Sequence, residues 1–299
     1  MASYKTRLVC LALYLFTICG ISGQNVEVRG YLGAAYYQGD LAPLPVAFSF
    51  SEGNLAWSLS VGMKVSKVFK LHTRFTLGKL IGDDVNASSD DRKRRNLNFQ
   101  SPLREYALLT DINLNHWLKG LDKYGINLYY STGIAVFHFE PQTILNGELV
   151  KLRTLGTEGQ GLPGYPDAYS NLQISIPFGM GFSFDFTKRL AMNFEVMPRI
   201  TFTDYIDDVS GTYVSTQELI DANRPITAQV ANKAVGNDGL PIEYQTGTKR
   251  GDSSDNDWYF FAGLGLSYTF GNVEETIVPN EVLVPAVLPE AAEENKPIK

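Results

Sequence analysis

Residues 171–186 read NLQISIPFGMGFSFDF, in which large apolar side chains alternate with small or polar ones. The even positions are Leu172, Ile174, Ile176, Phe178, Met180, Phe182, Phe184 and Phe186. The odd positions from 173 are Gln173, Ser175, Pro177, Gly179, Gly181, Ser183 and Asp185. Successive side chains of a β-strand point to opposite faces, so one face is apolar and the other small and polar. Because about 9–11 tilted residues cross a bilayer, this longer run predicts a transmembrane β-strand.

The same alternation recurs from residue 26, and the gaps between runs are short and long in turn. The expected strands are 26–39, 55–65, 71–77, 106–114, 126–136, 171–186, 190–202 and 258–270. The expected long loops are 40–53, 81–102, 141–170 and 204–255, and the tight turns lie near 67, 119–124 and 187–189. This pattern is typical of outer-membrane barrels. We therefore predict an all-β fold over residues 24–270: an eight-stranded antiparallel transmembrane β-barrel with short periplasmic turns and long extracellular loops.

Charged residues fall on the inward face of these strands, and none falls on the inferred lipid face. The inward set is Glu27, Arg29, Lys64, Arg74, Asp111, Asp185, Glu195 and Arg199. A soluble eight-stranded barrel would show the reverse, with apolar side chains inside. Eight strands leave an interior that side chains can fill, and unpaired buried charges are costly. We expect these residues to pair into a lumen ion-pair network that plugs the barrel; the alternative is a selective ion path.

Two further features of the strands carry expectations. Outward aromatic residues near the strand ends predict girdles at the membrane interfaces. These residues are Trp57, Phe184, Phe186, Trp258, Tyr268 and Phe270. Pro177 and Pro198 fall within strands of a barrel that has no free edge, so we expect a bulge or a local break at each.

The N-terminus has the pattern of a secretory signal peptide over residues 1–23. Lys5 and Arg7 precede an apolar run at 8–18, which is shorter than the about 20 residues of a membrane helix. Cys10 and Cys19, the two cysteines of the chain, both lie in this segment. A mature chain would therefore have no disulfide or thiol chemistry, and any membrane role would use strands.

Composition and motifs point away from enzymes and nucleic-acid binding. The net charge is −6, and no basic face indicates a nucleic-acid partner. His72, His116 and His138 lie in or next to different expected strands, without metal-ligand spacing. No nucleophile motif accompanies them, although serines near His138 leave a membrane hydrolase open as an alternative. We expect no catalytic residues, no metal and no cofactor.

The loop 81–102 contains a basic run at 92–95, RKRR, after two pairs of aspartates. Arginine forks match phosphate geometry, so one interpretation is a docking site for lipopolysaccharide phosphates. The other, which we favour, is a surface loop whose charges pair with each other.

Residues 271–299 differ in composition from the strands. They contain six Glu, two Lys and four Pro, and this composition cannot build a core of its own. Short apolar patches within them are candidate partner-binding positions: Val282, Leu283, Val284, Val287 and Leu288. The segment is either a disordered end or a periplasmic peptide that folds onto a partner.

Several short segments, in matching order, resemble one outer-membrane barrel family. They are YYQGDL at 36–41, GDD at 82–84, RNLNFQSP at 95–102, EGQGLPGY at 158–165, SIPFG at 175–179, TDYIDDVSG at 203–211 and DWY at 257–259. Together these segments resemble the family that includes the PorG-like component of the type IX secretion system. The likeness covers about residues 26–270 and leaves the C-terminal segment uncovered.

The resemblance implies a non-enzymatic part of a protein secretion and gliding machine. It also implies association with periplasmic secretion-complex proteins, besides contact with outer-membrane lipid. The expected location is the bacterial outer membrane, with both mature termini in the periplasm. A small porin or transport barrel is the main alternative, and an outer-membrane enzyme is the third.

Overall fold

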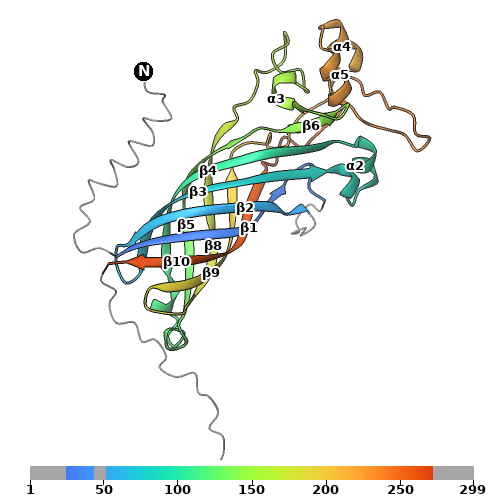
Figure 1. Ribbon diagram of the computed structural model, residues 1–299. Helices are drawn as coiled ribbons and strands as arrows, with labels where there is room; N and C mark the ends of the chain where they lie inside the picture. The colour runs from blue at the N-terminus through green and yellow to red at the C-terminus, as the bar shows by residue number, and fades with distance from the viewer. Residues whose placement is uncertain (1–24, 44–51, 272–299) are drawn as a thin grey trace, which may run out of the picture.

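Eight long antiparallel strands form the wall of a closed barrel in the computed structural model, which describes residues 25–43 and 52–271 (Figure 1). The wall strands are β1 (Val26–Gln38), β2 (Asn54–Lys64), β3 (Phe69–Asp83), β4 (Asn98–Asn113), β5 (Ile126–Phe139), β8 (Leu172–Asp185), β9 (Leu190–Thr201) and β10 (Trp258–Phe270). The predicted fold is therefore confirmed. The expected signal peptide and the C-terminal segment from residue 272 lie outside the described residues.

Pairing of the first and last strands closes the barrel. The β1–β10 ladder runs without interruption from Val26 opposite Phe270 to Gln38 opposite Trp258. The remaining strands pair with their neighbours in chain order, and β5 pairs directly with β8. A closed wall satisfies its backbone hydrogen bonds internally, which is what a strand-built membrane protein needs.

The outer surface of the wall is apolar. Leu32, Leu55 and Leu264 are 61%, 72% and 57% exposed, and they belong to rows of outward leucine, isoleucine and phenylalanine side chains. The inward rows are buried, and they hold small, polar and charged residues. This distribution is the one expected where lipid, rather than water, surrounds the wall.

The two ends of the barrel differ, and we call them the turn end and the loop end (Figure 1). The turn end carries residues 65–68, 114–125 and 186–189, together with the outer ends of β1 and β10. Its short helices are η3 (Leu114–His116) and η4 (Asp122–Tyr124). Long strands and most of the helices project from the loop end.

The loops are more ordered than the sequence predicted. The expected loop 81–102 is shorter, because β3 continues to Asp83 and β4 begins at Asn98. The loops hold η2 (Asp84–Asn86), α2 (Asp90–Arg95), the hairpin β6 (Gln142–Leu145) and β7 (Glu148–Lys151), α3 (Leu152–Leu155), α4 (Thr216–Asp221) and α5 (Pro225–Ala231). No helix of the described residues is long and apolar enough to cross a membrane.

The extension of β3 and β4 corrects the expectation that no strand carries an outward charge. Lys79 and Arg104 are exposed on the outward rows, beyond the ranges predicted for these strands. Both lie on the loop-end extensions, since Leu77 pairs with Arg104 and Lys79 with Pro102. Because charged residues are tolerated there, these two mark where the apolar band ends.

Each strand proline coincides with a local break. Pairing of β8 with β9 stops after Pro177 opposite Arg199 and resumes at Met180 opposite Val196 in the same register. The missing stretch includes Pro198, which keeps its pairing with Phe260 of β10 on the other side. The predicted breaks are therefore present, and the unchanged register shows that no residue is inserted as a bulge.

Candidate functional site

The lumen near the turn end holds a connected cluster of charges. Arg29 Nη2 lies 2.8 Å from Asp111 Oδ2, and Arg29 Nε also pairs with Glu27. Lys70 Nζ donates to Glu27 Oε2 over 2.7 Å. His72 Nε2 lies 2.9 Å from the other oxygen of Asp111. These five residues, which we call the turn-end cluster, come from β1, β3 and β4, which lie on one half of the wall.

A fully buried ion pair occupies the next layer. Arg74 of β3 donates to both carboxylate oxygens of Glu195 of β9, and the Nη2–Oε2 distance is 2.9 Å. Its guanidinium lies 4.8 Å from the centroid of the Tyr31 ring. Tyr31 of β1 and Tyr129 of β5 meet at 3.3 Å between their hydroxyls, so the two side chains meet inside the lumen.

Small residues on the wall make room for these two tyrosines. A Cβ at Gly181 would lie 2.4 Å from the Tyr129 ring, and one at Gly265 would lie 2.6 Å from the Tyr31 ring. Contacts this short are not sterically allowed, so any larger residue would displace a ring. The small inward residues that the sequence showed therefore allow large side chains from other strands to cross the lumen.

A second buried pair lies closer to the loop end. Arg199 of β9 makes a two-pronged contact with Glu105 of β4, with Nε–Oε2 and Nη2–Oε1 both at 2.9 Å. Tyr259 donates its hydroxyl to Glu105 Oε2 over 2.7 Å, and Thr76 donates to Oε1 over 3.3 Å. Four hydrogen bonds therefore hold the Glu105 carboxylate in a fixed geometry.

The longest loop closes the loop end of the lumen. Residues 203–210 are buried except for Tyr205, which is half-buried. Ile206 and Val209 join an apolar cluster that includes Tyr37, Phe99 and Phe137 of the wall. We call residues 203–210 the loop-end plug, because they pack over the lumen between the wall strands.

An acidic group lies where the loop-end plug meets the wall. The Tyr37 hydroxyl is 2.6 Å from Asp207 Oδ2 and 2.9 Å from Asp257 Oδ1. A hydroxyl has one proton to donate, so one of these two contacts requires a proton on a carboxyl group. Burial, reinforced by the charge of Asp40, raises the pKa of Asp207 to about 8. Burial also raises the pKa of Asp204 to about 8.

Two arginines tie the outer loops together. Arg95 of α2 contacts both oxygens of Asp84 at 2.8 Å, and it donates to the carbonyl of Arg250 at 2.6 Å. Arg250 in turn lies 2.9 Å from Glu158 Oε1. Arg94 pairs with Asp91 at 3.5 Å. Arg94 and Arg95 of the basic run therefore make contacts within the loops, in agreement with the interpretation we favoured over phosphate docking.

The lumen residues predicted from the sequence have three outcomes. Glu27, Arg29 and Asp111 are brought together, and Arg74 is joined to Glu195. Arg199 pairs with Glu105, a residue that the prediction missed. Lys64 and Asp185 correct the expectation of complete pairing: neither forms an ion pair with another described residue, and Asp185 instead accepts from Asn127 over 2.9 Å. Both lie near the turn end, where the lumen is open.

The missed partners had a signal in the sequence. Glu105 immediately precedes the expected strand 106–114 and shares the inward parity of Asp111. Lys70 likewise precedes the expected strand 71–77, and His72 lies on its inward row. Extending the two strands at constant alternation would have placed Glu105 and Lys70 in the lumen, where the pattern already placed His72.

The predicted girdle residues lie near the two ends of the wall. Trp57 and Trp258 are on the loop-end halves of β2 and β10. Four others are at the turn end and are 39–51% exposed: Phe184, Phe186, Tyr268 and Phe270. The partner-binding positions proposed at 282–284 and 287–288 lie outside the described residues.

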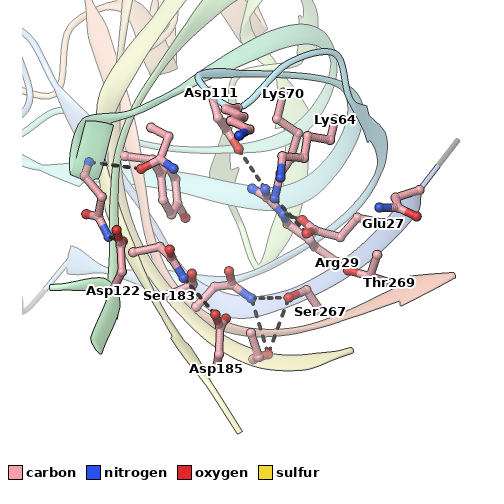
Figure 2. Close-up of a pocket in the computed structure, with 18 of the residues that line it drawn as sticks. Glu27, Arg29, Lys64, Lys70, Asp111, Asp122, Ser183, Asp185, Ser267 and Thr269 are labelled. Carbon is pink, nitrogen blue, oxygen red and sulfur yellow. Dashed lines mark hydrogen bonds and ion pairs between the residues drawn. The ribbon is translucent and has the colours of Figure 1, made fainter. Parts of the chain in front are cut away.

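A cavity in the described part of the chain opens at the turn end. It has a volume of about 480 Å³, and four residues of the turn-end cluster line it: Glu27, Arg29, Lys70 and Asp111 (Figure 2). Asp185, Ser183 and Ser267 line the wall opposite Lys64 and Lys70. In the part of the chain that the structure covers, no group of three or more His, Cys, Asp or Glu side chains is arranged to hold a metal ion.

The closed wall, apolar outside and filled with paired charges inside, defines a β-barrel protein of the outer-membrane type. Residues 6–223 match the model of a family described as "Domain of unknown function (DUF6089)". The chain belongs to this family. No curated protein matches the sequence.

Solved structures with a similar fold are outer-membrane barrels. Ail of Yersinia pestis, in complex with the heparin analogue sucrose octasulfate, has 8% identity and a TM-score of 0.38, over 83% of this chain and 100% of that one. The Neisserial surface protein A has 10% identity and a TM-score of 0.39, over 83% and 98%. OprG of Pseudomonas aeruginosa has 10% identity and a TM-score of 0.37, over 84% and 97%. These values describe a likeness of fold, and no function is transferred from them.

Proposed function

We propose that this protein is a non-enzymatic outer-membrane anchor that docks periplasmic ring components of a type IX secretion and gliding machine. The observation that carries the proposal is the filled lumen. Buried ion pairs, tyrosines and the loop-end plug occupy it in succession, so the interior offers no path for a solute. A membrane barrel that conducts no solute can still bind other proteins at its two exposed ends. The sequence resemblance to the PorG-like family suggests which partner is bound.

The orientation follows from the loop lengths. Outer-membrane barrels place short turns in the periplasm and long loops outside. On this basis the turn end lies in the periplasm, and Val26 and Phe270, which pair there, bring both ends of the barrel to that side. The segment that follows β10 then begins in the compartment where ring components are found.

A transport role has less support. Ion pairs of the turn-end cluster line the turn-end cavity, including Arg29 with Asp111 and Lys70 with Glu27. A solute would have to displace Arg74 and Glu195, whose side chains are both 0% exposed. Breaking such a pair leaves an uncompensated buried charge.

The proposal is tested by crosslinking in cells, followed by affinity purification of the barrel and identification of its partners. We expect ring components with the full chain and none with a chain truncated after Gly271. A chain carrying residues 272–299 in scrambled order is the matched control for length and charge. Full recovery of the ring components by the truncated chain would move the contact to the turns. Recovery of none by any form would reject the docking role.

A further inference from the structure

The outward face of the wall carries positive charge in one place. Among the eight wall strands that the structure describes, the outward rows contain Lys or Arg only at Lys79 of β3 and Arg104 of β4. Both side chains are exposed, and we call these two residues the wall cations. They are diagonal neighbours on adjacent strands, because Leu77 pairs with Arg104 and Lys79 with Pro102 (Figure 1). Diagonal positions lie about 7–8 Å apart, within reach of long side chains.

The wall cations have no counter-charge among the described residues. Lys79 Nζ donates a hydrogen bond over 3.1 Å to the side-chain amide oxygen of Gln100, which is neutral. The Arg104 side chain forms no ion pair or hydrogen bond with another residue in the described ranges. His138, which faces Arg104 across the β4–β5 ladder, adds no negative charge. Two like charges side by side repel each other, and an anion that contacts both relieves this repulsion.

The carboxylates of this side of the barrel do not supply that anion. Glu140 follows β5 and lies 2.7 Å from Lys151 Nζ, so its charge is already balanced. Asp83 shares the row of Lys79 but lies further from the apolar band, by about 13 Å along β3. Glu148 is at the tip of the β6–β7 hairpin, which meets β4 only through Gln142. The surface immediately around the wall cations therefore keeps a net positive charge.

Apolar side chains continue from the wall cations toward the middle of the wall. Phe75 lies on the row of Lys79, and Tyr106 and Leu108 lie on the row of Arg104. These three side chains are 39%, 52% and 46% exposed. A ligand at this place therefore meets two positive charges at one end and an apolar surface along the rest of its length.

A lipid with an anionic headgroup has the matching chemistry. A phosphate suits both the guanidinium fork of Arg104 and the ammonium group of Lys79, and acyl chains suit the apolar rows. A free phosphate ion would leave the apolar rows without a partner. The combination of both surfaces on two adjacent strands thus favours a lipid over a soluble anion.

We propose that β3 and β4 form a binding site for an anionic lipid of the leaflet that surrounds the loop end. Its headgroup phosphate contacts Lys79 and Arg104, and its acyl chains lie along Phe75, Tyr106 and Leu108. The inference does not rest on the secretion role or on which end faces the periplasm, because the site belongs to the wall of the barrel alone.

Native mass spectrometry tests the site by counting the lipids that stay on the purified barrel when it leaves detergent micelles. The micelles contain either phosphatidylglycerol, which is anionic, or phosphatidylcholine with the same acyl chains, which has no net charge. We expect the parent protein to retain phosphatidylglycerol in preference. Lys79→Gln combined with Arg104→Gln should weaken this binding roughly tenfold, because each basic residue at an anionic headgroup adds to the affinity. Retention of phosphatidylcholine should not change.

The matched control is Lys93→Gln combined with Arg94→Gln. It also removes one Lys and one Arg, but from α2, which is not part of the wall. We expect it to retain phosphatidylglycerol as the parent does. Faster gel migration before boiling than after shows that each variant is folded.

Three results would overturn the proposal. Equal retention of both lipids by the parent protein would show that the headgroup charge is not recognised. An equal loss of phosphatidylglycerol in the control would show a general effect of net charge. Displacement of the lipid by an equal concentration of inorganic phosphate would assign the wall cations to a soluble anion.

Discussion

Arg199 shows how a charged residue is accommodated in the centre of the barrel. Its side chain is 1% exposed and that of Glu105 is 0% exposed, and each satisfies the other through two hydrogen bonds. Arg199→Met leaves Glu105 buried without its counter-charge. We expect this substitution to lower the free energy of unfolding by about 3–5 kcal/mol, measured by urea titration in detergent.

Two further variants make the Arg199 prediction specific. Lys64→Met removes an unpaired cation from the open end of the lumen and should change stability by no more than about 0.5 kcal/mol. Combining Arg199→Met with Glu105→Gln removes both charges and should recover part of the loss. Equal effects of Arg199→Met and Lys64→Met would contradict the importance of the pair.

The buried aspartates of the loop-end plug predict a dependence of stability on pH. The pKa values of Asp204 and Asp207 are about 8, above the ordinary value of 3.8, because burial penalises their ionised forms. A carboxyl group with a raised folded-state pKa contributes stability that is complete below pH 4 and is lost as pH rises through 8. We expect the unfolding free energy to be lower at pH 9 than at pH 5.

The control for this pH dependence is the Asp204→Asn and Asp207→Asn double variant. Its side chains cannot ionise, so the decrease in unfolding free energy between pH 5 and pH 9 should be smaller than in the parent chain. Urea midpoints measured at the two pH values provide the comparison. A parent protein that is equally stable at both values, or more stable at pH 9, would show that these carboxyl groups do not retain protons in the folded state.

At the scale of the strand, depth in the membrane should set the effect of a charge. Leu264 lies midway along β10 on the outward face, whereas Leu172 is the first residue of β8 at the loop end. Arg at mid-membrane costs about 2–4 kcal/mol, and near an interface about 0–1 kcal/mol. Leu264→Arg should therefore destabilise the barrel in lipid vesicles several-fold more than Leu172→Arg.

The two leucine positions are a matched pair, because their side chains are 57% and 60% exposed. Urea titration of folded protein in vesicles measures both effects under the same conditions. The prediction depends on lipid surrounding the wall. In the absence of a hydrocarbon layer, Leu264→Arg and Leu172→Arg should therefore lower the unfolding free energy by nearly the same amount. Equal effects in vesicles would indicate that the apolar band is not positioned as the strand lengths suggest.

At the scale of the whole molecule, the stacked lumen layers predict a closed barrel. Arg74 with Glu195, Arg199 with Glu105, and the loop-end plug block the axis at successive levels. Reconstituted in planar bilayers, the protein should show no steady conductance above that of the bare membrane. Insertion is checked separately by faster gel migration before boiling than after, as expected of a closed barrel. Stable openings from inserted protein would favour the porin alternative.

Much of this architecture follows from local sequence pattern. The two-residue period assigns each side chain to a face, so residues 171–186 and their counterparts predicted the wall, its apolar exterior and its inward charges. The parity that placed Asp111 inside applied equally to Glu105. That residue was missed only because the predicted strand began one position too late. Strand ends are set by pairing with a neighbour, which the pattern of a single strand does not record.

The sequence by itself therefore determined that this chain makes a membrane barrel with charges inside, because alternation is a local property of the backbone. Only the tertiary structure decided which charges meet. Arg74 and Glu195 are 121 residues apart, and Tyr37 and Asp207 are 170 apart. Their contacts exist because closure between β1 and β10 and the packing of the loop-end plug bring distant positions to one level of the lumen. That level depends on the stagger of all eight strands together, which no single stretch of sequence specifies.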